Sequence, residues 1–123
     1  MSRVRYMYLH AKDGEFVFRN QDDNKDYMTQ NIVTVAMHYK GHKVFVVRSS
    51  NEPHCRKKAR EYAFDRLANV ALEGKSRKTL YGPTDNKDHT PLKAFAIKSG
   101  FKSVTVFKAA LLVFLNEQEQ KDE

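Results

Sequence analysis

The sequence has a single cysteine, only three prolines and five glycines, and no long apolar run. Cys55 alone excludes an intramolecular disulfide and a zinc site built from several thiolates. So few prolines and glycines exclude a linker-rich or low-complexity chain. The longest apolar stretch, residues 104–115, is interrupted by Lys108 and is shorter than the roughly 20 residues of a membrane-spanning helix. We therefore expect no membrane partner. The N-terminal residues also lack the apolar segment of a secretory signal, which favours a cytoplasmic location.

The composition is that of one folded domain with an excess of positive charge. A chain of 123 residues with 41% hydrophobic and 30% charged residues is typical of a single globular domain. We expect that domain to span residues 1–118, followed by a frayed polar tail over residues 119–123. The formal net charge of +7 favours polyanionic partners, either nucleic acid or an acidic protein surface.

The first half of the sequence predicts two consecutive β-hairpins. Residues 3–19 alternate in polarity around Asp-Gly at 13–14, a pair that tolerates the positive φ of a tight turn. Residues 32–49 form a second alternating run around Lys-Gly at 40–41. A two-residue turn there places one set of apolar side chains on a common face: Val33, Val35, Met37, Val44 and Val46.

The second half predicts about three helices. The first begins near Ser50 or Asn51 and ends at Gly74. Its expected core stripe consists of Cys55, Ala59, Tyr62, Ala63, Leu67, Val70 and Ala71. Residues 74–90 form a long connection, and the sequence leaves open whether that connection is functional. The predicted fold class is α+β, with an antiparallel four-stranded sheet from the two hairpins and the helices packed on one face.

Residues 90–114 read as two helices separated by a break, with Thr90 and Ser103 as helix caps. The spacing of Ala96, Gly100 and Val106 resembles that of helix-turn-helix repressors, and this resemblance implies a DNA-reading second helix. Residues 104–115, however, lack the polar face with which a recognition helix meets phosphates and bases. We therefore predict a helix that is buried in the core. The alternative is a homodimer through residues 103–115.

Two groups of side chains are candidates for nucleic-acid binding. The first group is basic and surrounds the first helix: Arg56, Lys57, Lys58, Arg60, Lys75, Arg77 and Lys78. Cations near a helix N-terminus oppose the helix dipole, and a bound phosphate would reverse that penalty. The second group lies on the other sheet face and combines aromatic rings with cations: Tyr6, Tyr8, Arg19 and Lys43. The alternatives are a solvated basic helix start for the first group and aromatic rings packed beneath a helix for the second.

These features favour a small, basic, non-catalytic nucleic-acid-binding protein with a regulatory or processing role. The alternative is a protein-binding regulator or inhibitor that docks on an acidic surface of a larger machine. A small nuclease is less favoured, because the sheet lacks paired acidic residues. The sequence predicts no catalytic residue, metal or cofactor, and it leaves the choice between DNA and RNA open.

Overall fold

The structure is a computed structural model that describes residues 4–18, 31–38, 41–47, 56–76, 78–82 and 90–121. The side chains of residues 56, 90–91 and 119–121 are not among those described. The expectations for Arg19, Cys55 and Arg77, and for the start of the first helix near residue 50, lie outside this part of the chain.

A five-stranded mixed sheet with strand order β2-β1-β3-β4-β5 forms the middle of the molecule. Its strands are β1 (Val4–Lys12), β2 (Glu15–Phe18), β3 (Ile32–His38), β4 (Lys43–Val47) and β5 (Leu80–Tyr81). The four-stranded antiparallel prediction is wrong, because β5 adds a fifth strand that runs parallel to β4. This strand lies within the residues expected to be a connection, and two residues are too few to show an alternating pattern.

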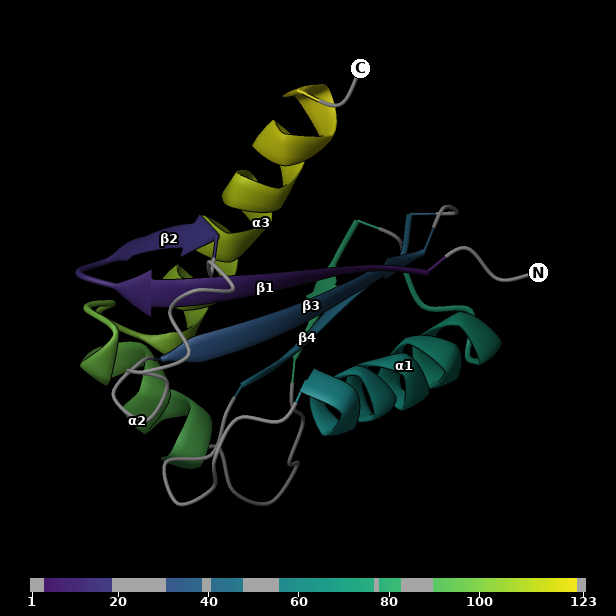
Figure 1. Cartoon of the computed structure of the whole chain (residues 1–123), viewed down its shortest axis with the longest axis horizontal. Helices are drawn as coiled ribbons and strands as arrows, with labels where there is room; N and C mark the ends of the chain where they lie inside the picture. Colours follow the sequence, from purple (N-terminus) through teal and green to yellow (C-terminus); the bar gives the residue numbers. More distant parts are fainter. Residues whose placement is uncertain are drawn as a thin grey trace.

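Helices cover both faces of the sheet (Figure 1). Helix α1 (Arg56–Leu72) packs on one face, and helices α2 (Thr90–Lys98) and α3 (Val104–Lys121) pack on the other. The prediction that all helices share one face is therefore wrong. Parallel neighbours need a connection that crosses over the sheet, and α1 lies in the connection between β4 and β5.

The first hairpin has the predicted register, whereas the register of the second differs from the predicted one by one residue. Leu9 pairs with Phe18 as the turn at residues 13–14 predicted. In the second hairpin Val35 pairs with Phe45, which leaves three residues rather than two between the last paired positions, 38 and 42. A shift of one residue turns every side chain of a strand to the opposite face. Lys43 and Phe45 consequently lie on the α2/α3 face of the sheet.

The predicted helix ends are confirmed where the structure describes them. After α1, the Gly74 N–H donates to Ala71 O at 3.2 Å and the Lys75 N–H donates to Val70 O at 3.2 Å. This pair of bonds is a Schellman motif, which satisfies the last carbonyls of a helix. At the start of α3 the Ser103 hydroxyl accepts the Val106 N–H at 3.1 Å. Helix α3 continues to Lys121, so it includes residues 119–121 of the expected tail.

Helices α2 and α3 are held against the first hairpin rather than presented as a free helix-turn-helix. The Gly14 N–H donates to Ser99 O at 2.9 Å, and a Cβ on Gly100 would lie 2.5 Å from the Gly14 nitrogen. The inner side of α3 buries Phe107 and Leu111 completely. The prediction that this helix is buried on every side is not confirmed, because Val113 on its outer side is 57% exposed.

Candidate functional site

Tyr6 and Tyr8 lie on the α1 face of β1, as the alternation of the strand predicted. Tyr6 pairs with Ala36 across the sheet and packs against the small apolar cluster beneath α1. Both tyrosines are half-buried, so each ring presents one part to the protein and another part to solvent. This part of the sheet face is therefore neither fully open nor fully covered by the helix.

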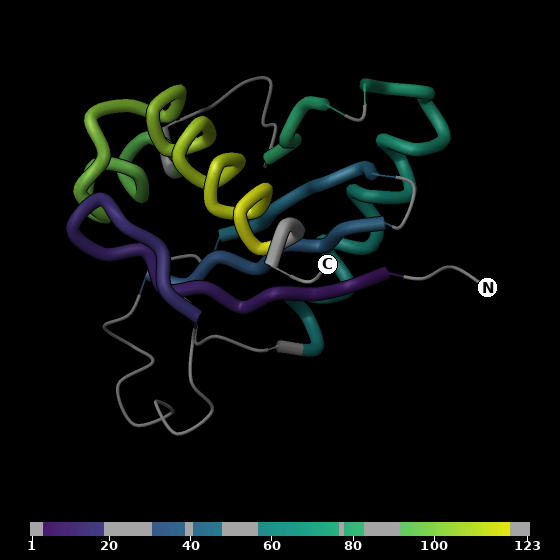
Figure 2. The backbone as a smooth tube through the Cα atoms, turned by 90° about the horizontal axis from the view of Figure 1, so that it is seen from above, coloured from purple at the N-terminus to yellow at the C-terminus, as the bar shows by residue number. Residues whose placement is uncertain are grey.

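Arg60 of α1 lies near Tyr6, which joins the two predicted groups of candidate residues. Burial raises the pKa of Tyr6 above its ordinary value of 10.0, the Arg60 guanidinium partly opposes this shift, and Tyr8 adds a smaller increase. The effect of Arg60 agrees with the packing of Tyr6 against the apolar cluster beneath α1. Helix α1 runs diagonally across the sheet, with its N-terminal end towards β1 and its C-terminal end towards β5 (Figure 2). Arg60 belongs to the N-terminal half of α1, the half that lies towards β1.

One flank of α1 continues this arrangement. Lys57 and Phe64 are three residues before and four residues after Arg60, so all three side chains lie on the same side of the helix. Lys57 and Arg60 are exposed, and Phe64 keeps 41% of its surface exposed. We call Tyr6, Tyr8, Lys57, Arg60 and Phe64 together the Tyr6–Arg60 surface. Phe64 was missed in the sequence, although its helical spacing from Arg60 was a usable signal.

The basic surface of α1 is less continuous than the sequence predicted. Lys58 and Tyr62 lie on the opposite flank of the helix, and two acidic residues, Glu61 and Asp65, lie between the flanks on the outward side. Tyr62 was expected in the core, but it is 63% exposed, because the buried stripe is centred on Ala63 and Leu67. A polyanion lying along the whole outer face would therefore meet carboxylates, whereas the flank towards β1 presents cations and rings.

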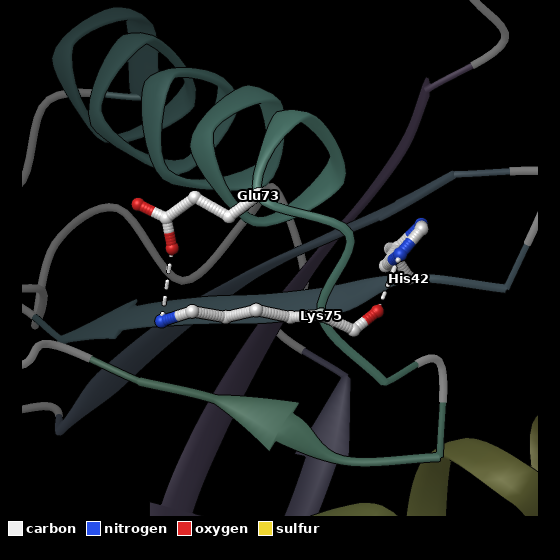
Figure 3. Close-up of polar contacts among 3 residues, drawn as sticks. All are labelled: His42, Glu73 and Lys75. Atoms are coloured by element: carbon white, nitrogen blue, oxygen red, sulfur yellow. Dashed lines mark hydrogen bonds and ion pairs between the residues drawn. The ribbon is translucent and has the colours of Figure 1, made fainter.

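The basic residues after α1 form a separate feature at the other end of the helix. The Lys75 amine lies 3.2 Å from a Glu73 carboxylate oxygen and 5.4 Å from the centre of the Tyr81 ring. The Lys75 carbonyl accepts a hydrogen bond of 3.1 Å from Nε2 of His42 (Figure 3). Since a carbonyl oxygen only accepts, Nε2 must carry the hydrogen. These contacts attach the end of α1 to the β3–β4 hairpin, so Lys75 has a structural role here.

The remaining candidates do not join the Tyr6–Arg60 surface. Lys78 is exposed beyond the far end of α1, where its backbone N–H donates to the Ser76 hydroxyl at 3.1 Å. Lys43 is only 8% exposed and its amine donates to the Gly41 carbonyl at 3.5 Å. The prediction that Lys43 shares a face with the tyrosines is wrong, because the shifted register of β4 places it on the α2/α3 face. The Arg56 side chain is not described.

The described residues contain no group of three or more His, Cys, Asp or Glu side chains that could hold a metal ion. In the same part of the chain, no helix is long and apolar enough to cross a membrane. Comparisons of the chain with protein-family models, curated proteins and solved structures give no match. What the Tyr6–Arg60 surface offers chemically is two exposed cations beside three partly exposed aromatic rings.

Proposed function

We propose that the protein is a cytoplasmic, non-catalytic nucleic-acid-binding protein with a regulatory or processing role. The observation that carries this proposal is that Tyr6 of β1 packs against the apolar cluster beneath α1, the helix that carries Arg60. Cations bind the phosphates of any sequence, and aromatic rings stack on bases that are not paired in a duplex. A surface that combines the two favours single-stranded DNA or RNA over a duplex, whose base faces are already stacked.

The cations and rings of the surface suit contact with a short segment of a nucleic-acid strand. Lys57 and Arg60 would neutralise phosphates, while Tyr8 and Phe64 would stack on neighbouring bases. The overall charge of +7 supports the approach of a polyanion before any specific contact forms. An acidic protein surface would use the same cations but would gain nothing from base stacking, which distinguishes it from nucleic acid.

The test is a fluorescence-anisotropy titration of the intact protein with single-stranded and double-stranded oligonucleotides of random sequence. We expect tighter binding to the single strand and a linear fall of affinity on a log–log salt plot. Substituting Lys57 and Arg60 together by Ala should reduce the slope by about two, because each removed contact lowers it by about one. The matched control replaces Lys93 and Lys98 of α2, two exposed lysines on the opposite side of the sheet.

The aromatic contribution is tested with Phe64→Ala, which should weaken single-strand binding by about 1–3 kcal/mol if the ring stacks on a base. Ile97→Ala serves as the control, since Ile97 is 53% exposed on α2. A polyglutamate of matched charge provides the comparison with an acidic protein surface. Equal affinity for polyglutamate and oligonucleotide, or no oligonucleotide binding at low salt, would overturn the proposal and favour a regulator that docks on acidic protein.

A further inference from the structure

The outer side of α3 carries an apolar stripe on the side of the sheet opposite the Tyr6–Arg60 surface. Val106 is 45% exposed and Val113 is 57% exposed, and Ala109 between them is exposed as well. These positions recur at spacings of three and four residues, so they form one line along the helix, opposite the buried line of Phe107 and Leu111. The stripe is thus a second apolar face on a helix whose first face already packs on the sheet.

The apolar surface continues from this stripe towards the edge of the sheet. Ala110 and Phe114 are half-buried on the side of α3 that faces β2. The Phe114 ring lies 5.6 Å from the ring of Phe18, which is itself 54% exposed on the edge strand β2. Exposed apolar side chains that extend from an outer helix face to an edge strand suit contact with another macromolecule.

The charges at the two ends of the stripe identify the partner. Lys102 is exposed just before the N-terminal end of α3, and Glu117 is exposed towards its C-terminal end, four residues after Val113. Consider a second copy of α3 packed antiparallel about the midpoint between Ala109 and Ala110. Helical residues equally distant from that midpoint then face each other, so Val106 lies opposite Val113 of the second copy. Lys102, two residues before the helix, then lies at the end of the interface where Glu117 of the second copy lies.

We propose that the protein forms an antiparallel homodimer through the outer stripe of α3. A two-fold axis pairs Val106 with Val113 and Ala109 with Ala110 of the other copy, so that the same patch is used on both copies, as an isologous interface requires. The small Ala109 side chain at the centre allows the helices to approach at a normal helix-packing distance of about 8–10 Å. The antiparallel arrangement also aligns the helix dipoles favourably.

The dimer has a consequence for binding, although it does not rest on the proposed function. Helices α1 and α3 lie on opposite sides of the sheet, so pairing through α3 leaves the Tyr6–Arg60 surface of each copy accessible on the outside. A contact of one helix per copy buries less than the roughly 1,200–2,000 Å² of a standard interface. We therefore expect a weak dimer, with a dissociation constant of about 10 µM.

Sedimentation velocity of the whole chain without nucleic acid tests the proposal over about 1 to 100 µM, a range that brackets this constant. We expect the 14.3 kDa monomer to convert to a species of twice that mass as concentration rises. Val113→Glu should abolish the dimer. Val17→Glu is the matched control, because Val17 is 51% exposed on the edge strand but points to the other face of the sheet. Wild-type protein that stays monomeric throughout, or equal loss of dimer in both variants, overturns the proposal.

A charge exchange tests the antiparallel register. Lys102→Glu or Glu117→Lys alone should raise the dissociation constant about tenfold, because each substitution creates two symmetry-related repulsions. The double variant should restore the wild-type value, a result that a general effect on folding would not produce. Crosslinking adds a geometric readout in a Cys55→Ser background, where oxidised Ala109→Cys should give covalent dimers and Ala94→Cys on α2 should not. The antiparallel arrangement is contradicted if the double variant does not restore dimerisation and Ala109→Cys gives no covalent dimer.

Discussion

The two faces of the sheet are packed very differently. The α2/α3 face holds a large cluster of aliphatic side chains and phenylalanines, in which the Phe107 ring lies 5.1 Å from Phe101 and 5.7 Å from Phe45. Among the described residues, the apolar cluster beneath α1 has five buried members, most of them small: Ala36, Val44, Ala63, Leu67 and Val70. Because burial of apolar area dominates stability, the first face should stabilise the fold and the second should hold its helix less firmly. The same division leaves α1 and its flank available for a ligand.

The strongest test of this comparison is the same substitution on each face. Leu111→Ala removes a completely buried side chain from among several rings and should cost about 3–5 kcal/mol of unfolding free energy. Leu67→Ala, on the α1 face, should cost about 2–3 kcal/mol, since its smaller neighbours and the less extensive contact let the helix close part of the cavity. Urea denaturation of both variants measures the difference. Equal losses would show that the two faces contribute alike.

The two helix-terminal glycines sharpen the comparison at the level of single backbone positions. Gly100 and Gly74 have positive φ values, 94° and 67°, and each ends a helix in the same motif. A Cβ on Gly100 would meet the backbone of the first hairpin, whereas a Cβ on Gly74 would meet nothing within 4 Å. Gly100→Ala should therefore cost about 2–4 kcal/mol, from positive φ and steric overlap together. Gly74→Ala should cost about 1 kcal/mol from φ alone. Thermal unfolding of the two variants measures the difference, and equal losses of stability would contradict the prediction.

The features that were predictable from the sequence are those that depend on neighbouring residues. The Asp13-Gly14 turn, the glycines after α1 and α2 and the Ser103 cap all act over a few positions, and the structure confirms them. The register of the second hairpin depends on distant packing instead. Phe45 is buried against Phe107, and Gly82 leaves room for its ring, since a Cβ there would lie 2.4 Å from it. Nothing next to residues 40–41 signals these contacts.

The candidate site was predictable only as separate pieces. The sequence marked the basic start of α1 and the aromatic residues of β1 as two groups. Their proximity follows from the path of α1 across the sheet between the parallel strands β4 and β5, and β5 is only two residues long. Lys43, in contrast, was predicted to lie on this surface and does not. A one-residue change of register turns its side chain to the other face of the sheet.

A smaller effect is expected where the end of α1 meets the sheet. His42 is buried and donates to the backbone carbonyl of Lys75, so His42→Ala leaves that carbonyl without its partner and should cost about 1–3 kcal/mol. Lys75→Ala keeps the carbonyl and removes an exposed ion pair with Glu73 and a contact with the Tyr81 ring, for which together we expect less than about 1 kcal/mol. Urea denaturation compares the two. A larger loss for the lysine variant would show that its side chain, and not its backbone, secures the helix.

The smallest expected effect concerns the ionisation of Tyr6 on the less densely packed face. Burial raises the pKa of Tyr6, so the folded state retains the phenol proton at a pH where the unfolded chain releases it. The stabilisation from the neutral phenol is therefore complete below pH 10 and is lost as the pH rises through the folded-state pKa. Tyr6→Phe should lose less stability than wild type between about pH 9 and pH 11, a range that spans the ordinary tyrosine pKa.

Arg60→Ala should raise the pKa of Tyr6 further, because the guanidinium favours the tyrosinate. Ultraviolet titration of tyrosinate, with Tyr6→Phe to assign the signal and Lys93→Ala as the control, measures this shift. A pKa that stays the same in Arg60→Ala would place Arg60 away from Tyr6 and separate the two halves of the Tyr6–Arg60 surface.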